Sequence, residues 1–332
     1  MTPAANSARP TIYDVAREAG VSKSLVSLVL NDSPLVAPAK HAAVMAAIDK
    51  LGYRKSRAAA NLASRRTKTV GLIIDDFQNP SFVDVLRGLR SALGPHGFHV
   101  AIREQQADDS SAVEGFLDSQ VDALVIAAEP GRDLPDLGVP TVLEGTRLHD
   151  VDGADHVSSD QALGVRLLMQ HLRSLGHIRI GHVTGLGGAA AERREAYAKF
   201  MASIGEAPRI AGEGNPTNED GGYDGAVELL RSHPDVSAVF AANDAMALGV
   251  RAALREVGRE VPADAALIGY DNSQFARSRF LDLTTVDNRG VDVGLACGEA
   301  ILRRLSDPAA PPTSVTIPSR LVVRSSSASA PP

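Results

Sequence analysis

The spacing of apolar residues changes near residue 69 and divides the chain into two regions. Over residues 11–52, apolar side chains recur three or four positions apart, which is the spacing of amphipathic helices. From residue 69 onward, short apolar runs such as VGLIID and ALVIAA alternate with stretches of helical spacing. Such alternation is typical of buried parallel strands connected by helices. The pattern therefore predicts a small all-α head followed by an α/β body.

The head is predicted to contain a helix-turn-helix at residues 11–31. Gly20 can adopt the positive φ that ends a first helix, and Ser22 is a suitable N-cap for a second. Two short helices around a tight turn are the pattern of this motif. A third helix is expected from Pro38 to Gly52. Its buried stripe is predicted to consist of Val44, Ile48 and Leu51.

The second helix has one face that its apolar residues leave free. At about 100° per residue, the residues presented on that face are Lys23, Ser24, Ser27 and Leu28. A short, mildly basic face of this kind suits a helix that enters the DNA major groove and meets base edges. An ordinary helical hairpin with a solvated face is the alternative.

Charge separates the same two regions. Residues 1–68 carry eleven Lys or Arg against four Asp or Glu, a formal charge of +7, in a chain whose net charge is −6. The remainder therefore carries −13. A basic head on an acidic body is the distribution expected when a nucleic-acid-binding module is joined to a part that does not touch nucleic acid.

Composition narrows the class of protein further. The single cysteine, Cys297, excludes an internal disulfide framework and a Cys-rich metal site, as fits a reducing cytoplasm. No long apolar run suits a membrane span, and the first residues lack the apolar core of a secretory signal, so we expect a cytoplasmic protein. No cofactor or metal site is predicted. The histidines are scattered, and capping or surface positions are expected for His171, His177 and His182.

The body is predicted to form two βαβ lobes with mostly parallel sheets, with the final segments crossing back between them. A cleft between such lobes, at the carboxyl ends of the strands, is the usual site for a small molecule. The predicted division is a DNA-binding head at 1–56, a basic hinge helix or linker at 57–68, the body at 69–325 and a disordered tail at 326–332. Lobe 1 is expected at about 69–157 plus part of 286–316, and lobe 2 at about 158–285 plus the final strands.

Six separated motifs follow one another in a definite order along the chain. They are IYDVAREAGVSKSLVSLVLN, AAANLAS, HLRSLGHIRIGHVTG, ANDAMALGVRAALREVG, VPADAALIGYDN and RLVVR. With these motifs, the chain resembles the lactose/galactose repressor (LacI/GalR) family of bacterial transcription regulators over nearly its whole length. The resemblance implies a DNA-binding head, a hinge helix and a body similar to periplasmic sugar-binding proteins, working as a homodimer on near-palindromic double-stranded operator DNA. A dimer also follows independently, because one short helix supplies too few base contacts and a two-fold pair reads two half-sites.

The resemblance also assigns DNA contacts to the head and hinge. Base-reading positions fall on Lys23, Ser24 and Leu28, and phosphate contacts fall on Tyr13, Ser22, Ser27 and Asn31. Leu62 corresponds to the leucine that wedges between bases in the minor groove, a mode that kinks DNA. Leu28 departs from a position that is often Arg. Since leucine cannot make a bidentate bond to guanine, the familiar operator sequence is not assumed.

In the body, the resemblance places effector contacts at Asp75, Arg193, Asn243 and Asp271. Arg194 is a rival to Arg193, because the preceding loop is shortened. Carboxylate, amide and guanidinium groups that converge on a cleft can bind the hydroxyls of a sugar or polyol. Asn243 and Asp271 also have structural interpretations, as a helix N-cap and a turn cap. The chain is thus predicted to be a repressor, not an enzyme, whose operator affinity a small molecule controls.

Two other functions are each compatible with one part of the sequence. Residues 185–190 fit the dinucleotide-binding pattern G-x-G-x-x-A, which would indicate an NAD-dependent oxidoreductase. The pattern lies deep in the second lobe, however, and a basic head has no role in such an enzyme. An exported solute-binding protein would share the fold of the body, but the helix-turn-helix and the missing signal argue against it.

Overall fold

The computed structural model describes residues 10–30, 33–53, 67–105, 109–131, 134 and 137–327. The chain forms two compact units, a head and a larger body that begins at Lys68. In the part of the chain that is described, no helix is long and apolar enough to cross a membrane.

The head is a bundle of three helices. They are α1 (Ile12–Ala19), α2 (Lys23–Val29) and α3 (Pro38–Leu51). Gly20 ends α1 with a φ of 66°, and the Ser22 hydroxyl caps α2 by accepting the backbone N–H of Leu25 at 3.3 Å. The predicted helix-turn-helix is therefore confirmed.

The core of the head differs in part from the predicted stripe on α3. Val44 is fully buried, whereas Ile48 and Leu51 are half-buried at the edge of the core. Ala47 and Tyr53, which were not predicted, complete it. Ala47 lies one turn after Val44 on the same face of the helix, and its small side chain gives a weak apolar signal in the sequence.

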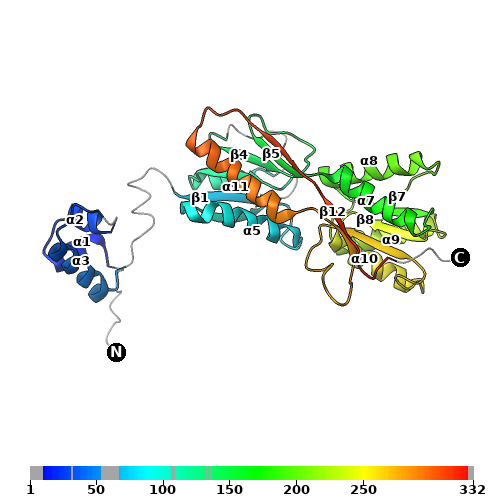
Figure 1. Ribbon diagram of the computed structural model, residues 1–332, viewed down its shortest axis with the longest axis horizontal. Helices are drawn as coiled ribbons and strands as arrows, with labels where there is room; N and C mark the ends of the chain where they lie inside the picture. The colour runs from blue at the N-terminus through cyan, green and yellow to red at the C-terminus, as the bar shows by residue number, and fades with distance from the viewer. Residues whose placement is uncertain are drawn as a thin grey trace. The chain divides into compact units, whose positions relative to one another are not determined.

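Each lobe of the body is built on one six-stranded sheet (Figure 1). In lobe 1 the order is β11-β5-β4-β3-β1-β2. The strands are β1 (Thr69–Ile74), β2 (His99–Glu104), β3 (Ala123–Ile126), β4 (Thr141–Glu144), β5 (Asp155–Ser159) and β11 (Ser314–Ile317). The helices are α5 (Ser81–Leu93), η1 (Gly94–His96), α6 (Ser111–Asp118) and α11 (Gly290–Ser306). Helices α5 and α11 lie side by side on one face of this sheet, and α6 covers the other.

In lobe 2 the order is β12-β10-β9-β8-β6-β7. The strands are β6 (Ile180–Val183), β7 (Arg209–Ala211), β8 (Ala238–Ala241), β9 (Ala266–Tyr270), β10 (Thr284–Asp287) and β12 (Arg320–Val322). The helices are α7 (Gln161–Ser174), α8 (Gly188–Ser203), α9 (Glu219–Ser232) and α10 (Asp244–Glu256). Helices α7 and α8 cover one face of this sheet, and α9 and α10 cover the other.

All strand pairs of the two sheets are parallel except β10 with β12, so the predicted pair of parallel-sheet lobes is confirmed. Strands β5 and β7 were not predicted. The chain crosses between the lobes from β5 to α7, from β10 to α11 and from β11 to β12. The last crossing is the red strand segment of Figure 1. These crossings place the carboxyl ends of several strands beside the junction of the lobes.

Three polar residues lie deeper in the body than the sequence predicted. Ser326 falls in the predicted disordered tail, yet it is buried, donates to the carbonyl of Leu267 at 2.6 Å and accepts the N–H of Thr284 at 2.8 Å. His177 and His182 are buried rather than exposed. Burial lowers the pKa of His182 to about 3, so its ring is neutral at physiological pH.

Candidate functional site

The four body residues predicted to contact an effector line a single cleft between the lobes. Asp75 directly follows β1, and Asp271 directly follows β9. Asn243 stands between β8 and α10, and Arg193 projects from α8. Loops at the carboxyl ends of parallel strands meet at the same edge of a sheet, which explains why residues so distant in sequence converge. The cavity in this cleft has a volume of about 90 Å³.

Other polar residues that were not predicted from the sequence line the same cleft. Among them are Glu129, Glu144, Arg147, Ser159, Gln161 and Asn288. Glu129 lies just beyond β3, and Glu144 and Ser159 are the last residues of β4 and β5. Their position at strand ends was the available signal, but β5 was not predicted and the loop after β3 carries no recognisable motif.

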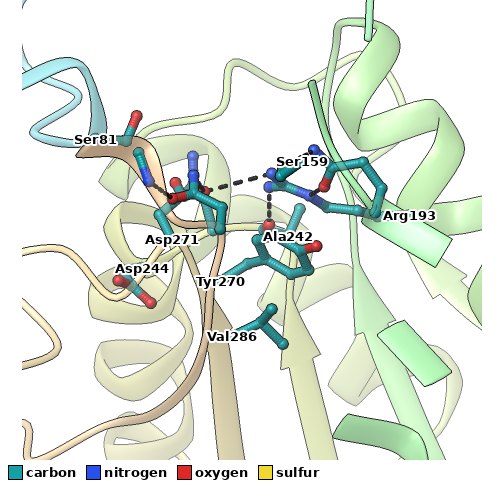
Figure 2. A network of polar contacts seen from close by, with 12 residues as sticks. Ser81, Ser159, Arg193, Ala242, Asp244, Tyr270, Asp271 and Val286 are labelled. Carbon is teal, nitrogen blue, oxygen red and sulfur yellow. Dashed lines mark hydrogen bonds and ion pairs between the residues drawn. The ribbon is translucent and has the colours of Figure 1, made fainter. Parts of the chain in front are cut away.

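Arg193 and Asp271 form a buried ion pair in the lining of the cleft (Figure 2). The Arg193 guanidinium donates Nε–H to the side-chain oxygen of Gln161 at 2.8 Å and Nη1–H to the carbonyl of Ala242 at 2.6 Å. Its Nη2 lies 3.3 Å from Asp271 Oδ1. Both charged side chains are less than one tenth exposed. Buried ions need such partners, because an unpaired charge would carry a large desolvation cost.

The aromatic ring of Tyr270 contacts the Arg193 guanidinium. Arg193 Cζ lies 3.7 Å from the centroid of the Tyr270 ring, as a cation–π contact requires. Gly164 leaves room for the hydroxyl end of the ring, since a Cβ at that position would lie 2.2 Å from the Tyr270 hydroxyl oxygen. The Tyr270 ring therefore adds to the contacts with Gln161, Ala242 and Asp271 that orient Arg193.

Burial raises the pKa values of three cleft carboxyls, Asp75, Glu144 and Asp271. Burial raises the pKa of Asp271 to about 6, although Arg193 and the amide of Asn288, which donates to Asp271 Oδ1 at 3.0 Å, both favour its charged form. Burial also raises the pKa of Asp75 to about 6, and the positive charge of Arg147 opposes that shift. Among the described residues, no other residue donates a hydrogen bond to the Asp75 carboxylate. Asp75 is therefore the cleft acid most available to a hydroxyl donor.

Asn243 adopts the structural role that was its alternative. Its Oδ1 accepts the N–H of Met246 at 2.7 Å and so caps α10, and its Nδ2 donates to the carbonyl of Thr217 at 2.8 Å. Arg194, the rival of Arg193, does not line the cleft and pairs with Glu213 at 3.4 Å. The structure thus places Arg193, and not Arg194, in the cleft. A ligand that contacts Asn243 would have to share its Oδ1 or Nδ2 with the hydrogen bonds to Met246 and Thr217.

The predicted DNA-reading face of the head is exposed. The fractional exposure is 60% for Tyr13 and 40% for Leu28, and the Lys23 ammonium lies 5.1 Å from the centroid of the Tyr13 ring. Ser22, Lys23 and Ser24 are exposed, and Ser27 is half-buried. Asn31 and Leu62 lie outside the described residues. Within the described part of the chain, no three His, Cys, Asp or Glu side chains gather as a metal site would require.

Comparison with known proteins supplies the family. Residues 11–56 match the model of bacterial regulatory proteins of the lacI family, and residues 169–327 match a periplasmic binding protein-like domain. The HTH-type transcriptional regulator CelR of Thermobifida fusca is 32% identical over 96% of this chain and 98% of its own length. The chain belongs to the LacI family of bacterial regulatory proteins.

Other LacI-family relatives agree with this placement. The ribose operon repressor of Escherichia coli K12 is 33% identical over 90% of this chain and 94% of its own length. A solved transcriptional regulator CelR–cellobiose complex shares 30% identity and a TM-score of 0.71, over 96% of this chain and all of that one. These relatives are transcription regulators, so the LacI-family chain is a DNA-binding transcription regulator with a ligand-binding body. The glycine-rich segment 185–190 joins the turn after β6 to the first turn of α8, and the relatives matched over nearly the whole chain are transcription regulators rather than oxidoreductases.

Proposed function

We propose that this LacI-family regulator is a homodimeric repressor whose affinity for a near-palindromic operator is controlled by a sugar or polyol bound in the cleft between the lobes. The observation that supports the effector most directly is the convergence of Asp75, Arg193 and Asp271 on one cleft. Carboxylates and a guanidinium held in fixed positions are suited to bidentate hydrogen bonds with neighbouring hydroxyls. Regulators of similar sequence are named for ribose and solved with cellobiose, which favours a sugar of this kind.

The proposal assigns DNA contacts to the exposed face of α2. Lys23, Ser24 and Leu28 would meet base edges, with Tyr13, Ser22, Ser27 and Asn31 on the phosphates. Two such helices in a dimer would read two half-sites. Residues 57–68, with Leu62, would link the head to the body and couple lobe motion to DNA binding. The hinge lies almost entirely outside the described residues, and its part rests on the sequence.

The experiment begins with a selection from a random duplex library, which yields an operator for the full-length protein. Thermal unfolding is then measured with ribose, cellobiose and related sugars and polyols, and operator affinity is measured with each ligand that stabilises the protein. Asp75→Asn should weaken binding of that ligand about tenfold or more, which corresponds to one lost charge-assisted hydrogen bond.

A matched control is Asp118→Asn, which makes the same change at an exposed residue on α6. This variant should bind the ligand like the unaltered protein. The effector site would be refuted if Asp75→Asn bound the ligand with unchanged affinity, or if no sugar or polyol bound at all.

A further inference from the structure

We propose that Glu129 is a specificity-determining residue, which makes the cleft select uncharged ligands and reject phosphorylated or other anionic ones. The inference deepens the proposed function and rests on the cleft being the effector site. The observation behind it is that the Glu129 carboxylate lies at the amino terminus of α8.

The amino terminus of α8 opens into the cleft. Gly188, Ala189 and Ala190 form its first turn, line the cleft and bring no acidic side chain of their own. The first backbone N–H groups of a helix lack helical partners and carry partial positive charge, so such an end attracts phosphate groups and other anions. In an acidic cleft, this helix end is the feature best suited to hold an anionic group of a ligand.

The negatively charged carboxylate of Glu129 is hydrogen-bonded to the amino terminus of α8, where an anionic ligand group would otherwise bind. Its Oε1 accepts the N–H of Gly188 at 2.5 Å, and its Oε2 accepts the N–H of Leu148 at 2.8 Å. Both oxygens are therefore fixed by backbone donors, one from each lobe. The close approach depends on glycine, because a Cβ at position 188 would lie 2.5 Å from the carbonyl oxygen of Thr146. A ligand phosphate would have to displace this carboxylate to reach the helix end.

The remaining charges of the cleft also disfavour an anion. Its other acids are Asp75, Glu144 and Asp271, and its cations are Arg147 and Arg193. Each cation is already engaged by an acid of the cleft, since Arg193 pairs with Asp271 and Arg147 donates to the carboxylate of Glu144 at 3.0 Å. With four carboxyl groups against two guanidinium groups, the cleft repels a phosphate and accepts hydroxyl donors.

The test uses full-length Glu129→Gln, which keeps the shape of the side chain and removes its charge. Glu195→Gln is the matched control, because it makes the same change on α8 at a side chain that is 65% exposed and pairs with Lys199 outside the cleft. The probe is inorganic phosphate, titrated at constant ionic strength with the thermal unfolding midpoint as readout. We expect Glu129→Gln to bind phosphate saturably and at least tenfold more tightly than the unaltered protein or the control. Equal phosphate binding by Glu129→Gln and Glu195→Gln would overturn the proposal.

A second measurement on the unaltered protein does not depend on how the variant folds. Ribose and cellobiose are compared with ribose 5-phosphate and cellobiose 6-phosphate in the same unfolding assay. Where a parent sugar binds, its phosphate ester should bind at least tenfold more weakly. Where the parent sugar does not bind, the ester should not bind either. Tighter binding of either ester than of its parent would refute the selection. If no sugar binds, the effector proposal fails, but the phosphate titration still decides the role of Glu129.

Discussion

Replacing Arg193 with alanine should destabilise the body strongly, whereas the same change at Arg194 should not. Arg193→Ala removes a cation that makes three hydrogen bonds and leaves Asp271 buried without its ion-pair partner. Breaking a buried pair from one side costs about 3–5 kcal/mol. Each kcal/mol lowers the unfolding midpoint of a domain of this size by about 2–4 °C, so a fall of about 6–20 °C is expected.

The control variant sets the scale for this measurement. Arg194 is the next residue along α8 and is one third exposed, and its partner Glu213 is mostly exposed. An exposed pair contributes about 0–1 kcal/mol, so Arg194→Ala should lower the midpoint by about 4 °C at most. The assay is thermal unfolding of the full-length variants followed by circular dichroism. Equal losses in the two variants would refute the account of Arg193 as part of a buried ion pair in the lining of the cleft.

The loss in Arg193→Ala should also depend on pH. Burial raises the pKa of Asp271 above its ordinary value of 3.8 to about 6, so the folded state binds a proton more tightly than the unfolded state. The contribution of Asp271 to stability is therefore greatest at low pH and is lost as the pH rises toward about 6. Without Arg193 its pKa should rise further. The stability deficit of Arg193→Ala should then be smaller at pH 5 than at pH 8, and a deficit that does not change with pH would contradict this reasoning.

Three further outcomes are expected elsewhere in the chain. Lys23→Ala should change the sequence preference in a random-duplex selection and reduce the binding free energy for the best site by about 1–3 kcal/mol. Lys50 is the control, because its ammonium pairs with Glu18 on the head, and Lys50→Ala should leave the preference unchanged. Gly88→Ala should lower the unfolding midpoint, because its Cβ would lie 2.1 Å from a backbone oxygen of α11, and Gly94→Ala, with nothing within 4 Å, should not. Leu62→Ala should weaken operator binding in a fluorescence titration without changing effector affinity of the free protein; an unchanged operator affinity would count against the hinge.

The parts of the fold that local chemistry determines could be predicted from the sequence. Gly20 and Ser22 mark the turn of the head, because a left-handed residue and an N-cap act within a few residues. Strands β5 and β7 could not be found in the same way. β5 has alternating half-buried polar positions, and β7 has only three residues, so neither gives a continuous apolar run.

Arg193 lies on α8 and was assigned by the family resemblance, whereas strand position can indicate a cleft residue that directly follows a recognised strand. Asp75 and Asp271 do so, and both line the cleft. Glu129 directly follows the run ALVIAA as well, but its role could not be predicted, because its bond to Gly188 joins residues 59 positions apart that meet only when the two lobes come together. The N-capping role of Asn243 is local, and the sequence offered it as an alternative.

We propose that ligand binding in the cleft and operator binding by the head are coupled, and reciprocal titration measures that coupling. Operator affinity is measured for the full-length protein with and without a saturating sugar that binds the cleft, and sugar affinity is measured with and without saturating operator. Because the coupling free energy between two binding sites is shared, the account predicts that each ligand changes the affinity of the other by the same factor. Operator affinity that is identical with and without the bound sugar would contradict it.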